Sequence, residues 1–198
     1  GATAAMTAAA ESLFKFIDEE PEKNPGTTEL LRVKGAVRFE DVQFAYPNSE
    51  KLAVKSFNLD VKPGEVIALV GSSGSGKSTL INMIPRFWAA TKGEIYFDDV
   101  PQSSVTLKSL RQQIALVSQE VVIFDGTIAD NIAYGCRDRV SEDDIWKAAE
   151  AAALADLIRS LPEGLNTPVG AGGSQLSGGQ RQRISIARAF LKNAPILL

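Results

Sequence analysis

The stretch that decides the fold is Val66–Ser78, which reads V-I-A-L-V-G-S-S-G-S-G-K-S. Its first five residues are continuously apolar, and this predicts a strand buried on both faces. Residues 71–78 then match the pattern Gly, four residues, Gly, Lys, Ser/Thr, a loop whose backbone N–H groups wrap nucleotide phosphates while the lysine reaches the terminal ones. A helix is expected from Lys77. Strand, glycine loop and helix in this order indicate an α/β nucleotide-binding fold.

A second motif lies about a hundred residues further along, at Leu176–Gln180, with the sequence L-S-G-G-Q. The residues that follow carry apolar side chains at helical spacing, so a helix is expected over 181–192. Ser177 also has a simpler interpretation as a helix cap, because serine and glycine are favoured at helix starts. Arg181, Arg183 and Arg188 are expected to be surface and packing charges on this helix.

Composition sets limits on the class of protein. The chain has 198 residues, 44% of them hydrophobic, which suits one globular domain with a short extension. Its formal charge is −3 without a block of like charge, so electrostatics indicates neither a nucleic-acid partner nor an anionic lipid surface. The single cysteine, Cys136, excludes an internal disulfide and fits a reducing compartment. The sequence shows neither a signal peptide nor an apolar run of the ~20 residues that a membrane helix needs.

The rest of the pattern alternates between strands and helices. The first twenty residues resemble the end of a helix leaving another domain, and a polar linker follows. Ser141 with Asp144 forms a capping-box pattern that predicts a helix through the alanine-rich run to about Ser160. Strands are expected at 37–44, 57–61, 93–97, 114–118 and 196–198.

On the two motifs, the chain resembles the nucleotide-binding domain of ATP-binding cassette (ABC) exporters, most closely the half-transporter type typified by bacterial lipid A flippases and multidrug exporters. The resemblance implies an α/β P-loop (RecA-like) core with a mainly parallel sheet, an antiparallel β layer near the N-terminus and a helical subdomain at about 119–180. It places residues 1–35 in the linker from a transmembrane domain and residues 36–198 in the nucleotide-binding domain.

The resemblance also assigns site residues. Tyr46, in the segment F-A-Y-P, would stack on adenine, and Gln119, in L-V-S-Q, would help to coordinate Mg²⁺ and sense the γ-phosphate. Ser78 would place its hydroxyl on Mg²⁺, and Thr79 would contact an adjacent phosphate. The full set expected to bind ATP is Tyr46, Gly71, Ser72, Ser73, Gly74, Ser75, Gly76, Lys77, Ser78, Thr79 and Gln119, with Ser177, Gly178, Gly179 and Gln180 facing the nucleotide of a second nucleotide-binding domain.

The chain departs from the family pattern in two places. The loop at 167–173, T-P-V-G-A-G-G, lacks the glutamate that exporters commonly carry there, which puts its charge-based contacts in doubt. The chain also ends where the Walker B strand begins, so the fold is expected to be C-terminally incomplete. The magnesium-binding aspartate, the catalytic glutamate and the switch histidine are then missing, and the chain has no histidine. We therefore expect at most residual ATP hydrolysis from these residues alone.

The implied function is ATP-driven export of a lipid or hydrophobic substrate by a head-to-tail dimer at the cytoplasmic side of a bacterial inner membrane. Residues 123–132 would face the membrane domain of the same chain, and no nucleic-acid partner is expected. One alternative is the ATPase subunit of an importer, which would begin near its first strand without the helical lead-in seen here. The other is a soluble ATPase of DNA maintenance, which would insert a long coiled coil between the two motifs.

Overall fold

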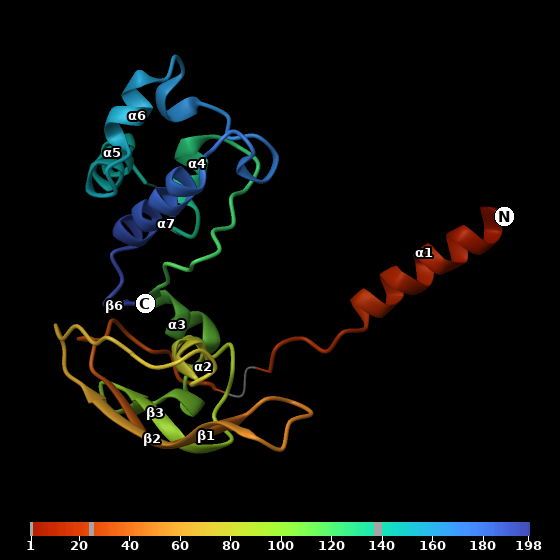
Figure 1. Ribbon diagram of the computed structural model, residues 1–198, viewed down its shortest axis with the longest axis vertical. Coiled ribbons are helices and arrows are strands. Elements are labelled where there is room, and N and C mark those ends of the chain that lie inside the picture. The colour runs from red at the N-terminus through yellow and green to blue at the C-terminus, as the bar shows by residue number, and fades with distance from the viewer. Residues whose placement is uncertain (1, 24–25, 137–139) are drawn as a thin grey trace.

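The computed structural model describes residues 2–23, 26–136 and 140–198, and its elements, apart from the N-terminal helix, form two groups joined by extended segments (Figure 1). A β layer with two short helices makes up one group, and four further helices make up the other. Each group has its own cluster of buried apolar side chains. The helices are α1 (Ala2–Ile17), α2 (Lys77–Met83), α3 (Leu107–Gln112), α4 (Ile128–Ala133), α5 (Glu142–Ala151), α6 (Ala155–Ser160) and α7 (Gly178–Lys192), with 3₁₀ turns at Gln102–Ser104, Gly164–Asn166 and Ala171–Gly173.

The antiparallel layer predicted near the N-terminus is confirmed. Its strands are β1 (Val37–Ala45), β2 (Leu52–Val61), β3 (Lys92–Phe97) and β4 (Val100–Pro101), in the order β2-β1-β3-β4. The buried residues of β1 follow the period of two along a strand on either side of a bulge between Phe39 and Val42, where the register shifts, and they point to one side of the layer. Helices α2 and α3 pack on this side through Leu80, Met83 and Leu110. The layer thus places the end of β1 beside the start of α2.

The parallel part of the fold is small among the described residues. Strand β5 (Ile114–Ala115) pairs in parallel with β6 (Ile196–Leu197). The pairing continues one step further, because the Val117 N–H donates to the Leu198 carbonyl at 2.9 Å. The strand predicted over 114–118 is therefore shorter than expected, whereas the one predicted over 196–198 is in place.

The strand predicted over Val66–Val70 is wrong for this structure. The segment has no regular secondary structure, and the side chains of Val66 and Val70 are 96% and 89% exposed. A short apolar segment forms a strand only where neighbouring strands take up its N–H and C=O groups. Among the strands that the structure describes, none pairs with this segment, since β5 pairs with β6. Most of the apolar residues before the glycine loop consequently face solvent, whereas Leu69 is partly buried against the core of the β layer.

The helix predicted from Ser141 begins as expected but does not continue to Ser160. Ser141 caps α5 and forms the full capping box with Asp144. The helix ends at Ala151, and Ala153 adopts a left-handed φ of 54°, after which α6 begins at Ala155. This break lets Leu154 and Ile158 turn into the helical core, where both are at most 2% exposed.

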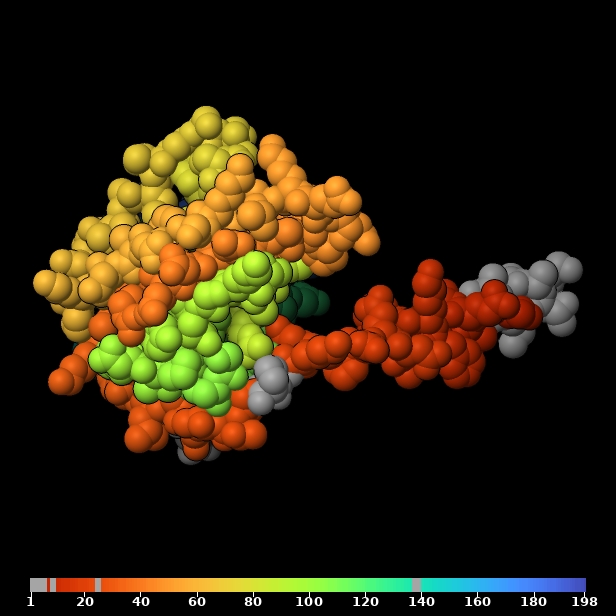
Figure 2. Space-filling view, turned by 90° about the horizontal axis from the view of Figure 1, so that it is seen from below, coloured from red at the N-terminus to blue at the C-terminus, as the bar shows by residue number. Residues whose placement is uncertain are grey.

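The N-terminal segment has a projecting part and a part that is built into the domain. Helix α1 extends away from the β layer, as Figures 1 and 2 show, and its apolar residues from Leu13 to Ile17 are exposed. Residues 26–36, in contrast, lie on the domain: the Leu30 N–H donates to Ser109 Oγ at 2.9 Å and the Val33 N–H to Gln113 Oε1 at 3.1 Å. Within the described residues, none of the helices is long and apolar enough to cross a bilayer.

Candidate functional site

The glycine loop lies between the exposed segment 66–70 and α2. Gly76 is the N-cap of α2 with a φ of 90°, a conformation that L side chains rarely adopt. A Cβ on Gly76 would lie 2.7 Å from the Ala53 carbonyl oxygen of β2, so a larger residue would displace the loop. Gly74 also has a left-handed φ, of 80°. The loop residues Gly71, Ser72, Ser73, Gly74 and Ser75 are all exposed, so the loop is open to solvent.

Lys77 places its ammonium group inside this loop. The Nζ donates to the carbonyl oxygens of Gly71 at 2.8 Å and Ser72 at 2.7 Å, and to Ser75 Oγ at 3.2 Å. These partners are neutral oxygens, so phosphate oxygens carrying full charge would be stronger acceptors for the same three donors. The geometry therefore fits an anion that replaces the loop oxygens as hydrogen-bond acceptor of the Lys77 ammonium group.

The two hydroxyl residues after Lys77 have different surroundings. Ser78 is exposed, and hydroxyl oxygens are among the hard oxygen ligands that Mg²⁺ accepts. Thr79 is 5% exposed, and its Oγ1 lies 2.6 Å from the hydroxyl oxygen of Tyr46. The loop helix is thereby linked directly to the residue after β1.

Tyr46 belongs to a cluster of three aromatic rings. Its ring centroid lies 4.9 Å from that of Phe44 and 5.1 Å from that of Trp88, with interplanar angles of 80° and 84°. Phe44 is buried at the end of β1, whereas Tyr46 is 38% exposed. The structure thus brings Tyr46 next to the glycine loop, and it adds Trp88, a residue that the sequence interpretation did not select.

Gln119 lies in an exposed bend after β5. The bend is held by its neighbours: Ser118 Oγ donates to the Glu120 carbonyl at 2.6 Å, and Gln182 Nε2 of α7 donates to the Ser118 carbonyl at 3.4 Å. The second contact connects the bend to the helix that carries the second motif. An amide oxygen at this position is a hard donor of the kind that Mg²⁺ accepts, so the residue type fits the assignment made from the sequence.

The second motif forms the start of α7, which begins three residues earlier than predicted. Ser177 is the N-cap, and the capping box is complete: the Gln180 N–H donates to Ser177 Oγ at 3.2 Å and the Ser177 N–H to Gln180 Oε1 at 2.9 Å. A Cβ on Gly178 or Gly179 would meet nothing within 4 Å. Packing within the described chain therefore does not require glycine at either position.

Residues 123–132 are fixed to α7 by two side chains. Asn131, 1% exposed, accepts from the Phe124 N–H at 2.9 Å and donates to the Phe124 and Thr127 carbonyls at 2.9 and 3.0 Å. Arg188 donates to the carbonyls of Asn131 and Val122 at 2.6 and 2.7 Å and to Asn131 Oδ1 at 2.9 Å. Desolvation lowers the pKa of Arg188 from its ordinary value. The Arg188 guanidinium group thus joins α7 to residues 123–132.

Arg188 was placed among the surface and packing charges of the helix, and its specific partners were missed. Its position four residues after the buried Ile184 was a usable signal, because residues at this spacing share a helix face. It also lies 5.6 Å from the ring centroids of Phe124 and Tyr134, whose own rings are stacked 3.9 Å apart. Arg183 makes a simpler contact, with the Ala153 carbonyl.

The loop at 167–173 is packed against the same segment through its backbone. The Val169 N–H donates to the Gly126 carbonyl at 3.0 Å, and the Ile128 N–H donates to the Thr167 carbonyl at 3.1 Å. A Cβ on Gly173 would lie 2.8 Å from Ile123 Cγ2, so this glycine permits close packing. The missing glutamate does not prevent contact between the loop and the segment.

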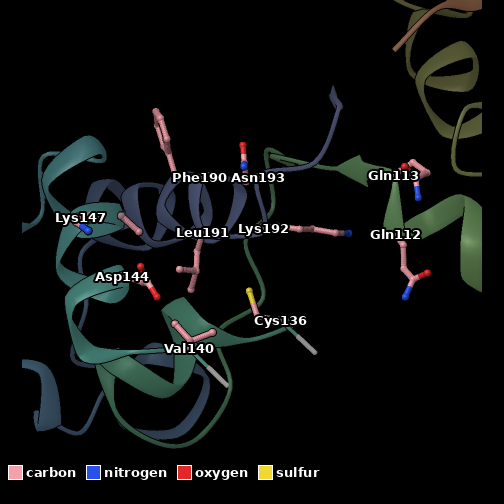
Figure 3. Close-up of a pocket in the computed structure, with 12 residues that line it drawn as sticks. Gln112, Gln113, Cys136, Val140, Asp144, Lys147, Phe190, Leu191, Lys192 and Asn193 are labelled. Atoms are coloured by element: carbon pink, nitrogen blue, oxygen red, sulfur yellow. The ribbon is translucent and has the colours of Figure 1, made fainter. Parts of the chain in front are cut away.

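A large hollow of the described structure lies elsewhere. It has a volume of about 870 Å³ and opens between α5, the end of α7 and residues 112–113 (Figure 3). Lys192 extends across it and donates to the carbonyls of Arg111 and Ile114. Residues 71–79 are not among those that line it. The candidate phosphate site is thus an open loop rather than an enclosed cavity.

Comparison with known proteins supports the interpretation of these motifs. The family model described as ABC transporter matches residues 54–198. The chain is 54% identical over 191 residues to the "ATP-dependent lipid A-core flippase" of Dechloromonas aromatica, which covers 96% of this chain and 33% of that protein. The protein of the same name in Coxiella burnetii is 49% identical over 189 residues, with 96% of this chain and 32% of that protein covered.

A solved structure agrees with these relatives in fold. The "Structure of a bacterial Atm1-family ABC exporter with ATP bound" superposes with a TM-score of 0.86 at 38% sequence identity, covering 95% of this chain and 33% of that one. The chain therefore spans about a third of the length of the proteins it matches. It belongs to the ABC transporter family, and it has the α/β P-loop fold of the ATPase domain.

Proposed function

We propose that this chain is the nucleotide-binding domain of an ABC exporter that couples ATP binding and hydrolysis to movement of a lipid or hydrophobic substrate across a membrane. The observation that carries this proposal is the identity of about 50% to lipid A-core flippases over 96% of the chain. That match includes the N-terminal region, which the importer and DNA-maintenance alternatives do not explain. In this proposal residues 1–35 link to a membrane domain, and a helical subdomain extends over about 119–180.

The glycine loop binds the phosphates of ATP. Lys77 exchanges its contacts with the Gly71 and Ser72 carbonyls for phosphate oxygens, and Thr79 contacts an adjacent phosphate. Tyr46 stacks on the adenine. The hydrogen-bond distance between Tyr46 and Thr79 supports this assignment, because it places the base-binding ring beside the phosphate-binding loop.

Ser78 and Gln119 hold Mg²⁺ in this proposal, each through an oxygen atom. Mg²⁺ held there would supply positive charge that offsets the charge of the phosphates. Ser78 orients its hydroxyl toward that charge, and the bend at Gln119 is positioned by its contact with Gln182.

The start of α7 faces the nucleotide of a second nucleotide-binding domain in a head-to-tail dimer. Gly178 and Gly179 support this role, since each has open space where a Cβ would lie and each leaves backbone uncovered for an outside ligand. Ser177 and Gln180 hold the helix start in shape through their capping box. Residues 123–132 contact the membrane domain, and the assembly lies at the cytoplasmic side of a bacterial inner membrane.

The test is nucleotide binding by the purified protein, measured by calorimetry for wild type, Lys77→Ala and Lys55→Ala. Lys55 is an exposed lysine of β2, which makes it a matched control for loss of one positive charge. Loss of a charge-assisted contact costs about 1.5–3 kcal/mol, so Lys77→Ala is expected to weaken ATP binding by roughly 10- to 150-fold. Lys55→Ala is expected to bind as wild type does.

Export is tested separately, with the full-length protein reconstituted into liposomes that carry a fluorescent lipid. ATP should accelerate movement of the lipid between leaflets for wild type and not for Lys77→Ala. Equal ATP affinity in Lys77→Ala and Lys55→Ala would refute the phosphate site. ATP binding without ATP-dependent lipid movement would refute the export function and leave the nucleotide site standing.

A further inference from the structure

We infer that Trp88 is a positioning residue for the nucleotide base, because it sets the plane of the Tyr46 ring. The inference rests on the proposed nucleotide site and extends it to a residue outside both sequence motifs. It predicts that Trp88 affects binding of ligands that carry a base and has little effect on binding of phosphate chains.

Trp88 reaches Tyr46 because the chain reverses directly after α2. Arg86 adopts a left-handed φ of 58°, and the N–H groups of Phe87 and Trp88 both donate to the Asn82 carbonyl, at 2.9 and 3.4 Å. The buried side chain of Gln102 donates to the Met83 and Ile84 carbonyls at 2.8 and 2.9 Å, which holds the end of α2. Trp88 is thus supported by backbone contacts of the same helix that starts at the glycine loop.

Two kinds of contact hold the Tyr46 side chain: a hydrogen bond at its hydroxyl and ring contacts at its faces and edges. Its hydroxyl lies 2.6 Å from Thr79 Oγ1, and a phenol oxygen lies on the axis about which the ring turns. A hydrogen bond at that oxygen therefore fixes where the axis points and leaves the ring plane free. Rings that touch Tyr46 away from the axis fix the plane, and these are Phe44 and Trp88, both within about 10° of perpendicular to it.

The two ring neighbours have different surroundings. Phe44 is 3% exposed and belongs to the core of the β layer, so its position is set by the sheet. Trp88 is only partly buried and comes from the segment after α2. The Trp88 ring also contacts Phe44, with centroids 5.5 Å apart. Trp88 therefore completes the constraint on the Tyr46 plane and ties it to the phosphate-binding helix.

A planar base gains from stacking only if the opposing ring lies parallel to it. Loss of the Trp88 ring frees the Tyr46 plane, and part of the stacking contribution is then lost to ring reorientation. Aromatic pairs contribute modestly, so we expect ATP binding by Trp88→Ala to weaken by about three- to tenfold. Binding of tripolyphosphate, which has no base, is expected to stay within about twofold of wild type.

The experiment measures the dissociation constants of ATP and tripolyphosphate by calorimetry for wild type, Trp88→Ala, Trp88→Leu and Trp88→Phe. Trp88→Phe keeps a ring and should restore most of the ATP affinity, whereas Trp88→Leu fills space without a ring and should behave like Trp88→Ala. Trp146→Ala is the matched control, because Trp146 is the other tryptophan of the chain and lies on α5 against Arg159. In a Tyr46→Ala background, Trp88→Ala should have no further effect on ATP.

Equal weakening of ATP and tripolyphosphate in Trp88→Ala and Trp88→Leu would overturn the inference, because it would show a general effect on the loop. Unchanged ATP affinity in both variants would overturn it as well. Wild-type protein that binds neither ligand would refute the proposed function, and the inference with it. Wild-type binding that is insensitive to position 88 refutes the inference alone.

Discussion

Replacement of Asn131 by alanine is expected to destabilise the protein strongly. The carboxamide is 1% exposed and joins residues 123–132 to each other and to α7. Its oxygen accepts from the Phe124 N–H and from Arg188, and its nitrogen donates to the Phe124 and Thr127 carbonyls. The Thr127 carbonyl also accepts from the Asn131 N–H, so it keeps a partner in the variant. The Phe124 N–H and C=O, in contrast, lose the hydrogen-bond partners that the Asn131 side chain provides.

The magnitude follows from those two backbone groups. A fully buried group left without a partner costs about 1–3 kcal/mol, and the two Phe124 groups are part-buried, so access of water makes the sum smaller than the maximum. We expect a loss of about 3 kcal/mol in the free energy of unfolding. With a urea slope of about 2–3 kcal/mol/M, the unfolding midpoint should fall by about 1–1.5 M.

Two further variants make the measurement decisive. Asn131→Asp keeps both acceptor contacts and gains a charge beside Arg188, but its second carboxylate oxygen faces the Phe124 and Thr127 carbonyls with no hydrogen to donate, so its loss should be close to that of Asn131→Ala at neutral pH. Asn58 makes three comparable contacts, with Asp41 and Ser56, but it is exposed on the β layer. Asn58→Ala should cost less than about 1 kcal/mol, because water replaces the lost partners. Equal losses for Asn131→Ala and Asn58→Ala would refute the reasoning that burial sets the cost.

Two capping variants test the second motif and the acid stability of α5. Ser177→Ala should cost about 1 kcal/mol in stability and leave ATP binding by the monomer unchanged, but it should impair ATP-dependent dimerisation, as followed by light scattering. Ser141→Ala should cost the same stability without altering dimerisation. Equal dimerisation of the two variants would contradict the proposal that Ser177 acts on the nucleotide of the partner domain. Hydrogen bonds from the Ser141 side chain and backbone lower the pKa of Asp144, so this carboxylate stabilises the fold above about pH 4 and the stabilisation is lost as pH falls through the lowered pKa. The stability advantage of wild type over Asp144→Asn should therefore shrink below about pH 4 in urea titrations, and an advantage that grew there would show the opposite sign.

Features that depend on neighbours in sequence were predictable. The capping boxes at the starts of α4, α5 and α7 are visible as a hydroxyl residue followed three positions later by an acid or amide. The strands of the β layer carry the period of two in their own residues. The glycine loop needs left-handed backbone at Gly74 and Gly76, and only the glycines of the motif satisfy this without strain.

Features that depend on distant partners were not predictable. Continuous hydrophobicity at Val66–Val70 says that a strand is possible, but pairing requires a neighbour that the segment itself cannot specify. The break at Ala153 lies in an alanine-rich run that favours helix locally, and it arises because Leu154 is drawn into the core. Trp88 has no motif around it, and its role is apparent only where the chain reversal after α2 brings it to Tyr46.

The loop at 167–173 contains no acidic residue, and it still contacts residues 123–132. Side-chain ion pairs at a surface contribute little and weaken with salt, whereas backbone hydrogen bonds keep their geometry whatever the side chains are. This loop meets residues 123–132 through two backbone bonds and through the close approach of Gly173 to Ile123. Arg188 holds the other side of the same segment, again through backbone carbonyls. The segment is therefore fixed from both sides by contacts that a change of acidic side chain in the loop does not remove.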